Sequence, residues 1–221
     1  MKKTFKLVVL SSIISTFLFA SDNNSSNSIV VDSIGLNLGK LYSDHSQKNH
    51  NGIITVTHHP YKNHTGAEIY LTLNGVFDED DLKPYFSISH SNNDDMTHDC
   101  ILAGVNKYYK HDHFDIYAGV LGGYGQLDWG YDPINGTKDN NYDANSFIIG
   151  LQGGVEYPID DTLSLGVNAK YLLHDYETQL EPSNSFNATV THDKTIFLGL
   201  GINMKFGEEK KRNLKKSKGT L

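Results

Sequence analysis

The sequence predicts an all-β protein that folds as an eight-stranded, antiparallel, up-and-down transmembrane β-barrel. Three observations predict this fold. The stretch 194–206 alternates between apolar residues and small or polar ones with one exception, seven earlier segments show the same alternation, and the connections between segments alternate between long and short. Successive side chains of a strand point to opposite faces, so each segment has one apolar and one polar face. An even number of such strands with long and short connections is typical of barrels in lipid.

The stretch 194–206 has the longest apolar row. Its apolar positions are Ile196, Leu198, Leu200, Ile202, Met204 and Phe206. The alternate row is small or polar apart from Phe197, and consists of Thr195, Gly199, Gly201, Asn203 and Lys205. A long apolar row that ends on an aromatic residue favours a strand that faces hydrocarbon, and we expect this segment to close the barrel.

The start of the chain has the pattern of a secretory signal over residues 1–20. Lys2, Lys3 and Lys6 precede an apolar run over 7–19, and Ala20 is a small residue at a suitable cleavage point. The run is shorter than the ~20 residues that a membrane-spanning helix needs, which favours a cleaved signal over an anchor. Residues 21–32 are rich in Ser and Asn and predict a flexible linker.

The barrel is expected over 33–206. Its eight predicted strands are 33–42, 64–75, 82–90, 98–109, 114–129, 146–157, 162–176 and 194–206. The long connections are 43–63, 91–97, 130–145 and 177–193, and tight turns are expected near 78–81, 110–113 and 158–161. Long loops outside the cell and short periplasmic turns place both ends of the barrel chain in the periplasm. The remaining residues, 207–221, predict an unfolded basic periplasmic tail.

The charge of the chain excludes one class of partner. The formal net charge is −7, and six basic residues against two acidic ones fall in the tail, so the barrel segment is more acidic than the total indicates. An acidic body argues against nucleic acid as a partner. Cys100 is the single cysteine, so no intrachain disulfide can form.

Three local phrases carry a resemblance to a known class of protein. They are 117–125 (Y-A-G-V-L-G-G-Y-G), 153–159 (G-G-V-E-Y-P-I) and 163–167 (L-S-L-G-V). With them the chain resembles the small eight-stranded outer-membrane barrels, similar to the OmpA transmembrane domain and the opacity-type family. The resemblance implies a place in the bacterial outer membrane among lipid and lipopolysaccharide. It also implies insertion by the barrel-assembly machinery, which usually reads an aromatic residue such as Phe206 at the end of the last strand.

The polar row of the strands is expected to fill the lumen. The candidate lumen network consists of Glu68, Asn106, Asp115, Gln152, Glu156, Asn168 and Lys170. Eight strands leave an interior just wide enough for side chains to fill, and buried charges need partners of opposite sign. A packed polar plug is therefore favoured, and a narrow porin-like channel or conduit for small solutes is the alternative interpretation.

The histidines are concentrated near the predicted outer loops. A possible metal site would use His45, His50, His58, His59 and His64. Imidazoles can bind zinc or copper, but no pair here has the spacing of a known site, so a solvated loop is favoured and no cofactor is expected.

One tetrapeptide raises an enzymatic alternative. Ser89-His90-Ser91-Asn92 is similar to the H-x-S-N motif of outer-membrane lipid A deacylases, but is one residue shorter. Adjacent strand residues face opposite ways, so His90 and Ser91 could not form a base–nucleophile pair. The sequence therefore predicts no enzyme, and a lipid-modifying activity is the second alternative.

Outward aromatic residues are expected to form girdles at the two edges of the bilayer. They are Tyr42, Tyr109, Trp129, Tyr157, Tyr171 and Phe206. The sequence as a whole predicts an outer-membrane barrel with a structural or surface-interaction role through acidic, His-rich loops, whose ligand it does not identify.

Overall fold

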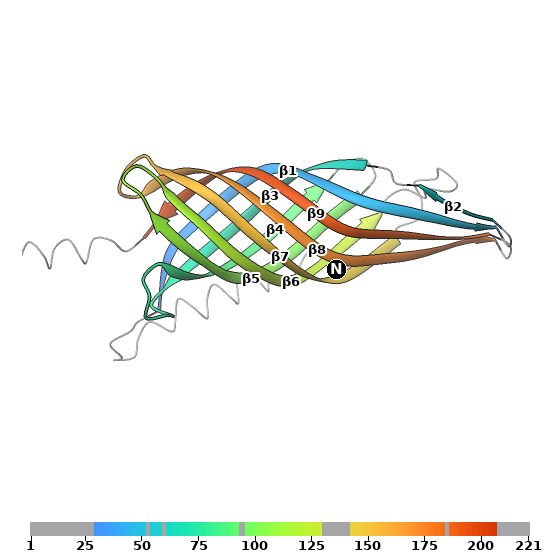
Figure 1. The fold of residues 1–221 in the computed structure, drawn as a ribbon, viewed down its shortest axis with the longest axis horizontal. Helices are drawn as coiled ribbons and strands as arrows, with labels where there is room; N and C mark the ends of the chain where they lie inside the picture. Colours follow the sequence, from blue (N-terminus) through green and yellow to red (C-terminus); the bar gives the residue numbers. More distant parts are fainter. Residues whose placement is uncertain are drawn as a thin grey trace, which may run out of the picture.

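The computed structural model describes residues 29–51, 54–58, 61–92, 96–129, 142–183 and 186–206, which form nine β-strands. The strands are β1 (Val30–Asn51), β2 (Ile54–His58), β3 (Tyr61–Asn74), β4 (Leu82–Asn92), β5 (Met96–Lys110), β6 (Asp115–Trp129), β7 (Tyr142–Pro158), β8 (Leu163–Ser183) and β9 (Phe186–Lys205). Eight of them, β1 and β3 to β9, form a closed antiparallel barrel (Figure 1). This confirms the predicted fold class and strand number.

The barrel closes where the last strand pairs with the first. β1 and β9 run antiparallel, from the pair Ser33–Lys205 to the pair His50–Asn187. β1 begins at Val30, three residues before the expected start of the first strand at residue 33, so the linker ends earlier than predicted. The reason is visible at Asp32, whose carboxylate accepts hydrogen bonds from Asn74 Nδ2 at 2.6 Å and Lys83 Nζ at 2.6 Å. The predicted signal 1–20, most of the linker and the tail 207–221 lie outside the described residues.

Two predicted loops are largely strands. Segment 43–63 contains the end of β1, all of β2 and the start of β3, and segment 177–193 contains the end of β8 and the start of β9. In Figure 1 these strands extend well past the barrel as a narrow sheet. Polar residues form strands here because their backbones pair with a neighbour, and Ser46 Oγ lies 2.7 Å from Thr191 Oγ1 across β1 and β9. A strand surrounded by water needs no apolar row, so alternation of hydropathy could not reveal it. The sheet made by the outer parts of β1, β8 and β9 together with β2 is called the extension below.

The opposite end of the barrel carries the short turns. Gly75, after β3, has φ 81°, in the left-handed region that favours glycine. Between β7 and β8, Asp160 Oδ1 accepts hydrogen bonds from the amides of Thr162 at 2.7 Å and Leu163 at 2.8 Å. The Phe206 amide donates to the Asp32 carbonyl at 2.7 Å, so both ends of the barrel chain lie at this end.

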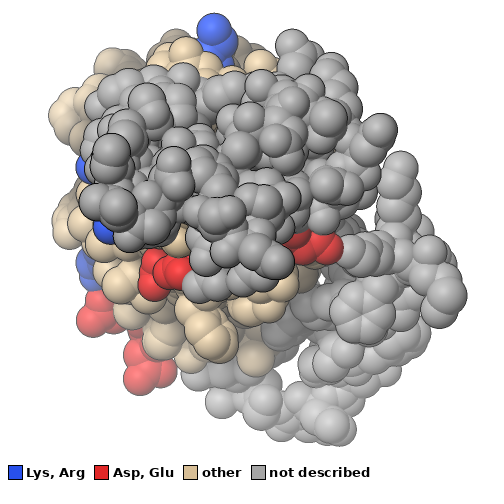
Figure 2. All heavy atoms as spheres, turned by 90° about the vertical axis from the view of Figure 1, so that its right-hand side faces the viewer, with Lys and Arg blue, Asp and Glu red and all other residues tan. Residues whose placement is uncertain are grey.

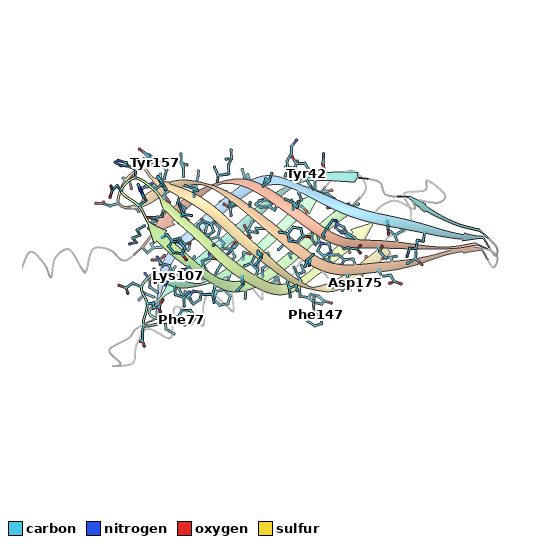
Figure 3. The ribbon with its side chains drawn as sticks, viewed as in Figure 1. Tyr42, Phe77, Lys107, Phe147, Tyr157 and Asp175 are labelled. Carbon is cyan, nitrogen blue, oxygen red and sulfur yellow. The ribbon has the colours of Figure 1, made fainter. Side chains whose placement is uncertain are left out.

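The outer face of the barrel is an apolar belt. The exposed fractions of Leu200, Val120 and Phe147 are 68%, 60% and 82%, far above what a soluble protein leaves exposed over a continuous surface. Among the predicted girdle residues, Tyr109, Tyr157 and Phe206 lie outward toward the turn end, and Tyr42 and Tyr171 lie outward nearer the extension (Figure 3 labels Tyr42 and Tyr157). The side chain of Trp129 lies outside the described residues. No helix in the described part of the chain is long and apolar enough to cross a membrane.

Candidate functional site: the filled lumen

The middle of the lumen holds a buried ion pair. Lys170 on β8 donates to Glu68 Oε1 on β3 and to the hydroxyl of Tyr85 on β4 at 2.7 Å, and the Tyr85 hydroxyl donates to the same carboxylate oxygen at 2.9 Å. The second oxygen, Oε2, accepts from Asn37 Nδ2 at 2.8 Å. Glu68 and Lys170 are 2% and 4% exposed. Two charges this deep are tolerated because each one satisfies the other, and Tyr85 and Asn37 supply further hydrogen bonds.

A second polar group lies toward the turn end of the lumen. Lys205 Nζ is 2.9 Å from Asp115 Oδ2 and 3.6 Å from Glu156 Oε2. Glu156 Oε2 also accepts from Asn203 Nδ2 at 3.1 Å. Between this group and the mid-lumen pair, Gln152 Nε2 donates to Asn106 Oδ1 at 2.6 Å.

The predicted lumen residues thus all point inward, but they form separate groups. Glu68 and Lys170 are one group, Asp115 and Glu156 share Lys205, and Gln152 bonds to Asn106. Asn168 is buried beside Gly199 of β9. The alternation along each strand identifies which residues point inward. Which of them come into contact depends on the tilt of the strands, and alternation does not reveal that tilt.

An apolar layer adjoins the ion pair in the lumen. Its buried side chains come from β3 to β8, and they are Tyr70, Tyr85, Cys100, Leu102, Leu121, Ile148 and Leu172. Aromatic side chains fit in because glycines face them: a Cβ on Gly35 would lie 2.2 Å from the Tyr70 ring. A cavity of about 20 Å³ beside this layer, lined by Leu41, Lys170 and others, has room for about one water molecule.

The histidines lie elsewhere than the sequence predicts. His64 was expected at the start of a strand, beside an outer loop and a possible loop metal site, but its side chain is 2% exposed and lies inside the barrel on β3. His45, His50 and His58 are on the strands of the extension, with side chains outside the described residues, and His59 lies outside them altogether. The predicted loop metal site therefore loses His64, because the alternation of β3 continues past the apolar row and turns this side chain inward.

Three further histidines join His64 in the lumen, at the end nearer the extension. His98 on β5, His174 on β8 and His192 on β9 are all buried. The ring centroids are 4.5 Å apart for His174 and His192, 5.8 Å for His98 and His174, and 6.1 Å for His98 and His192. We call His64, His98, His174 and His192 the histidine cluster. Sequence reasoning missed it because it considered these residues together with the outer loops that they adjoin, although His64, His98 and His174 lie in predicted strands. The available signal was the inward row of His98, Cys100 and Leu102.

Hydrogen bonds hold the cluster together across the barrel. His98 Nε2 lies 2.7 Å from the hydroxyl of Tyr176 on β8. His174 Nδ1 donates to the backbone carbonyl of His192 at 2.8 Å, and its Nε2 lies 2.9 Å from Thr195 Oγ1. Because a carbonyl can only accept, His174 carries its proton on Nδ1 and accepts at Nε2 in the neutral form. In the described residues no three His, Cys, Asp or Glu side chains are placed to hold a metal ion.

The cluster lies beyond the apolar belt. The outward neighbours of His98 and His174 include Asp99 and Asp175, whereas the belt on these strands begins at Ile101 and Leu173. Burial lowers the pKa of His98 to about 3, and the nearby His174 and His64 lower it further. Burial also lowers the pKa of His174 to about 4, against the opposing effect of its hydrogen bond to His192. Both imidazoles are therefore neutral at neutral pH.

The tetrapeptide 89–92 has one side chain of interest on the outer face. His90 Nδ1 lies 2.7 Å from Asp99 Oδ1, and its side chain is 61% exposed. Ser91 is 2% exposed and points into the lumen, as the alternation predicts. The position two residues after His90, on the same face, is Asn92, which offers no hydroxyl for nucleophilic attack.

Figure 2 looks onto the end that carries the extension. Basic and acidic side chains both appear around the rim among the described residues. Acidic residues that point outward there include Asp99, Asp143, Asp175 and Glu177. Figure 3 shows Asp175 on the outside of the barrel where the extension begins.

This architecture is shared with solved structures of outer-membrane proteins. No protein-family model and no curated protein sequence matches the chain. Among solved structures it is similar to OprG, an outer-membrane protein of Pseudomonas aeruginosa, with a TM-score of 0.57 and 12% identity over 79% of this chain and 96% of that one. It is also similar to Neisserial surface protein A, with a TM-score of 0.52 and 13% identity over 78% of this chain and 97% of that one. The protein therefore has the fold of the small eight-stranded outer-membrane β-barrels.

Proposed function

We propose that the protein is an integral outer-membrane barrel that presents the extension outside the cell, with a structural and surface-interaction role. The observation that carries the proposal is the combination of an apolar outer face with a packed polar interior. A soluble barrel has the reverse arrangement, with its apolar residues inside. In lipid, a closed barrel satisfies every backbone hydrogen bond of its membrane-spanning strands, and its apolar belt contacts hydrocarbon instead of water.

The packed lumen argues for display rather than transport. Any solute would have to pass both the apolar layer with Leu102 and Leu121 and the buried pair Glu68–Lys170. Opening that pair would leave two charges without partners. Purified protein in planar bilayers is expected to give no stable conductance steps, and regular steps would favour the channel alternative.

The outward side chains at the rim favour a role in binding partners and argue against a lipid-modifying enzyme. His90 and Asp99 form a pair at the rim, but the neighbouring hydroxyls of Ser89 and Ser91 belong to the lumen-facing row of β4. The acidic residues around the rim favour partners with basic surfaces or divalent cations shared with lipopolysaccharide phosphates. Surrounding lipid, lipopolysaccharide and the barrel-assembly machinery are the other partners that this proposal implies.

Cysteine labelling of intact cells tests the orientation. Ser183→Cys lies at the tip of the extension, and Asp112→Cys lies in the turn between β5 and β6. A membrane-impermeant maleimide should label the first variant in whole cells and the second only after lysis. Cys100 is 3% exposed and should stay unlabelled in the folded protein, which makes the unmodified chain the control. Labelling of Asp112→Cys alone in intact cells would reverse the proposed orientation, and recovery of heat-modifiable protein outside the membrane fraction would refute the proposal.

A further inference from the structure

The outer half of β8 is paired with β9 but, in the described part of the chain, has no backbone pairing with β7. Backbone pairing between β7 and β8 ends at Ile149–Leu173, whereas β8 continues to Ser183 with β9 on its other side. Beyond Leu173, the described links from β8 to the rest of the barrel wall run through side chains. The amide of Asp175 donates to Ser146 Oγ at 2.8 Å, and the hydroxyl of Tyr176 meets His98 Nε2 at 2.7 Å.

The histidine cluster lies at this attachment. It brings together residues of β3, β5, β8 and β9, whose rings pack within 4.5 to 6.1 Å of one another, centroid to centroid, for the three pairs among His98, His174 and His192. Neutral imidazoles can pack this closely, and the rings of His98, His174 and His192 each take part in a local hydrogen bond. Imidazolium ions at these distances repel one another, and their burial is costly without a carboxylate partner.

We propose that the histidine cluster is a pH-sensitive clasp. With neutral imidazoles it joins β5 to the outer half of β8 and β9 across the lumen. When acid charges the imidazoles, the extension separates from β5 while the part of the barrel within the belt stays closed.

The charges around the cluster support this behaviour. The titratable or charged side chains near it in the described residues are His64 of β3, His90 of β4, Asp99 and Cys100 of β5, Asp128 of β6, Asp143 of β7, Lys170, Asp175 and Glu177 of β8, and Asp193 and Lys194 of β9. The carboxylates among them point to the outer face rather than into the cluster. The nearest carboxylate deeper in the lumen, Glu68, is already paired with Lys170.

Linkage gives the sign and size of the effect. The pKa of His174 is lowered by burial to about 4 and returns to ~6.5 once the side chain reaches water, so acid favours the open form. Stability of the clasp is complete above pH ~6.5 and falls as the pH drops toward 4. From His174 alone, the opening equilibrium at pH 5.0 should exceed that at pH 7.5 by roughly 30-fold.

Hydrogen exchange on the full chain in lipid nanodiscs tests the proposal. Rates at pH 7.5 and 5.0 would be compared after correction for the intrinsic pH dependence of exchange. Amides of β8 beyond Leu173 and of β9 before Lys194 should open roughly 30-fold more at pH 5.0, while those of the belt segment 163–173 should not change. Equal opening at both pH values, or equal loosening of the belt segment, would overturn the proposal.

Matched variants separate the cluster from other histidines. The double variant His98→Gln/His174→Gln cannot gain these charges and should remove most of the pH effect. The control His111→Gln/His113→Gln changes two exposed histidines at the turn end and should behave as the unmodified chain. Heat-modifiable mobility at pH 7.5 shows whether each variant is folded. If the cluster variant is not, NMR titration of the histidine rings in the unmodified protein decides, and titration of His98 and His174 near 6.5 would refute the clasp.

Discussion

At the scale of single residues, the lumen is defined by which side chains meet across it. The alternation of each strand predicted correctly that Glu68 and Lys170 point inward, since their neighbours form apolar rows. It could not predict that they bond, because they are 102 residues apart and the meeting point depends on strand tilt. The same limit explains the histidines: His98 was predicted at the start of a strand and His192 in a loop, and neither position reveals that the two rings meet in the lumen.

The buried pair gives a residue-scale prediction. Lys170→Met should destabilise the barrel by about 3–5 kcal/mol, because it leaves the Glu68 carboxylate buried without its cation. Urea unfolding in lipid vesicles at pH 7.5 measures the change. The double variant Glu68→Gln/Lys170→Met removes both charges and should recover most of the loss. If Lys170→Met alone were as stable as the unmodified chain, the pair would not be buried as described.

At the scale of elements, the strands could be predicted where hydrocarbon imposes a pattern. All eight barrel strands were located from alternation, but β1, β8 and β9 each continue seven to nine residues farther into the extension than predicted. The extension could not be located, because both faces of a strand in water accept polar residues. β1 beyond Tyr42 reads as Ser, Asp, His, Gln, Lys and Asn, a composition typical of loops, and only its pairing with β9 makes it a strand.

The belt gives an element-scale prediction. Leu200→Arg on β9 and Leu165→Arg on β8 each place a charge on the lipid face near mid-strand, where the cost is ~2–4 kcal/mol. Folding yield into vesicles and heat-modifiable mobility should both fall. His90→Arg is the matched control, since its side chain is 61% exposed at the rim beside Asp99. Normal assembly of both leucine variants would contradict a membrane location for this face.

At the scale of the whole molecule, topology followed from an even strand count and the alternation of connection lengths. Those features predicted that the two ends of the barrel chain lie together. The hydrogen bond from the Phe206 amide to the Asp32 carbonyl shows that they do. The interaction partner does not follow from topology, because the same barrel supports many surfaces and the outward side chains at the rim decide recognition.

The C-terminal end of β9 gives a prediction at the scale of the whole molecule. A chain that stops after Phe206 retains β9 and both hydrogen bonds that anchor its end, from Lys205 to Thr162 and from Phe206 to Asp32. Its insertion, measured by heat-modifiable mobility of membrane fractions, should equal or exceed that of the full chain. A chain that stops before Ile202 removes the last turn-side pairs with β1 and is the control that should fail. Loss of insertion in the first variant would place an assembly signal within 207–221.

The pairing of β9 with β1 has a consequence for how the chain reaches its native state. The two residues that begin this seam, Ser33 and Lys205, are 172 positions apart (205 − 33), so the ring is completed by contacts between the two ends of the barrel chain. Contacts of high sequence separation form late, because chain entropy must be lost before they contribute. Until then β1 and β8 each carry a row of unsatisfied amides and carbonyls that can pair with another molecule. A newly exported chain is therefore vulnerable to aggregation until its last strand arrives, and a holding chaperone in transit should increase its yield.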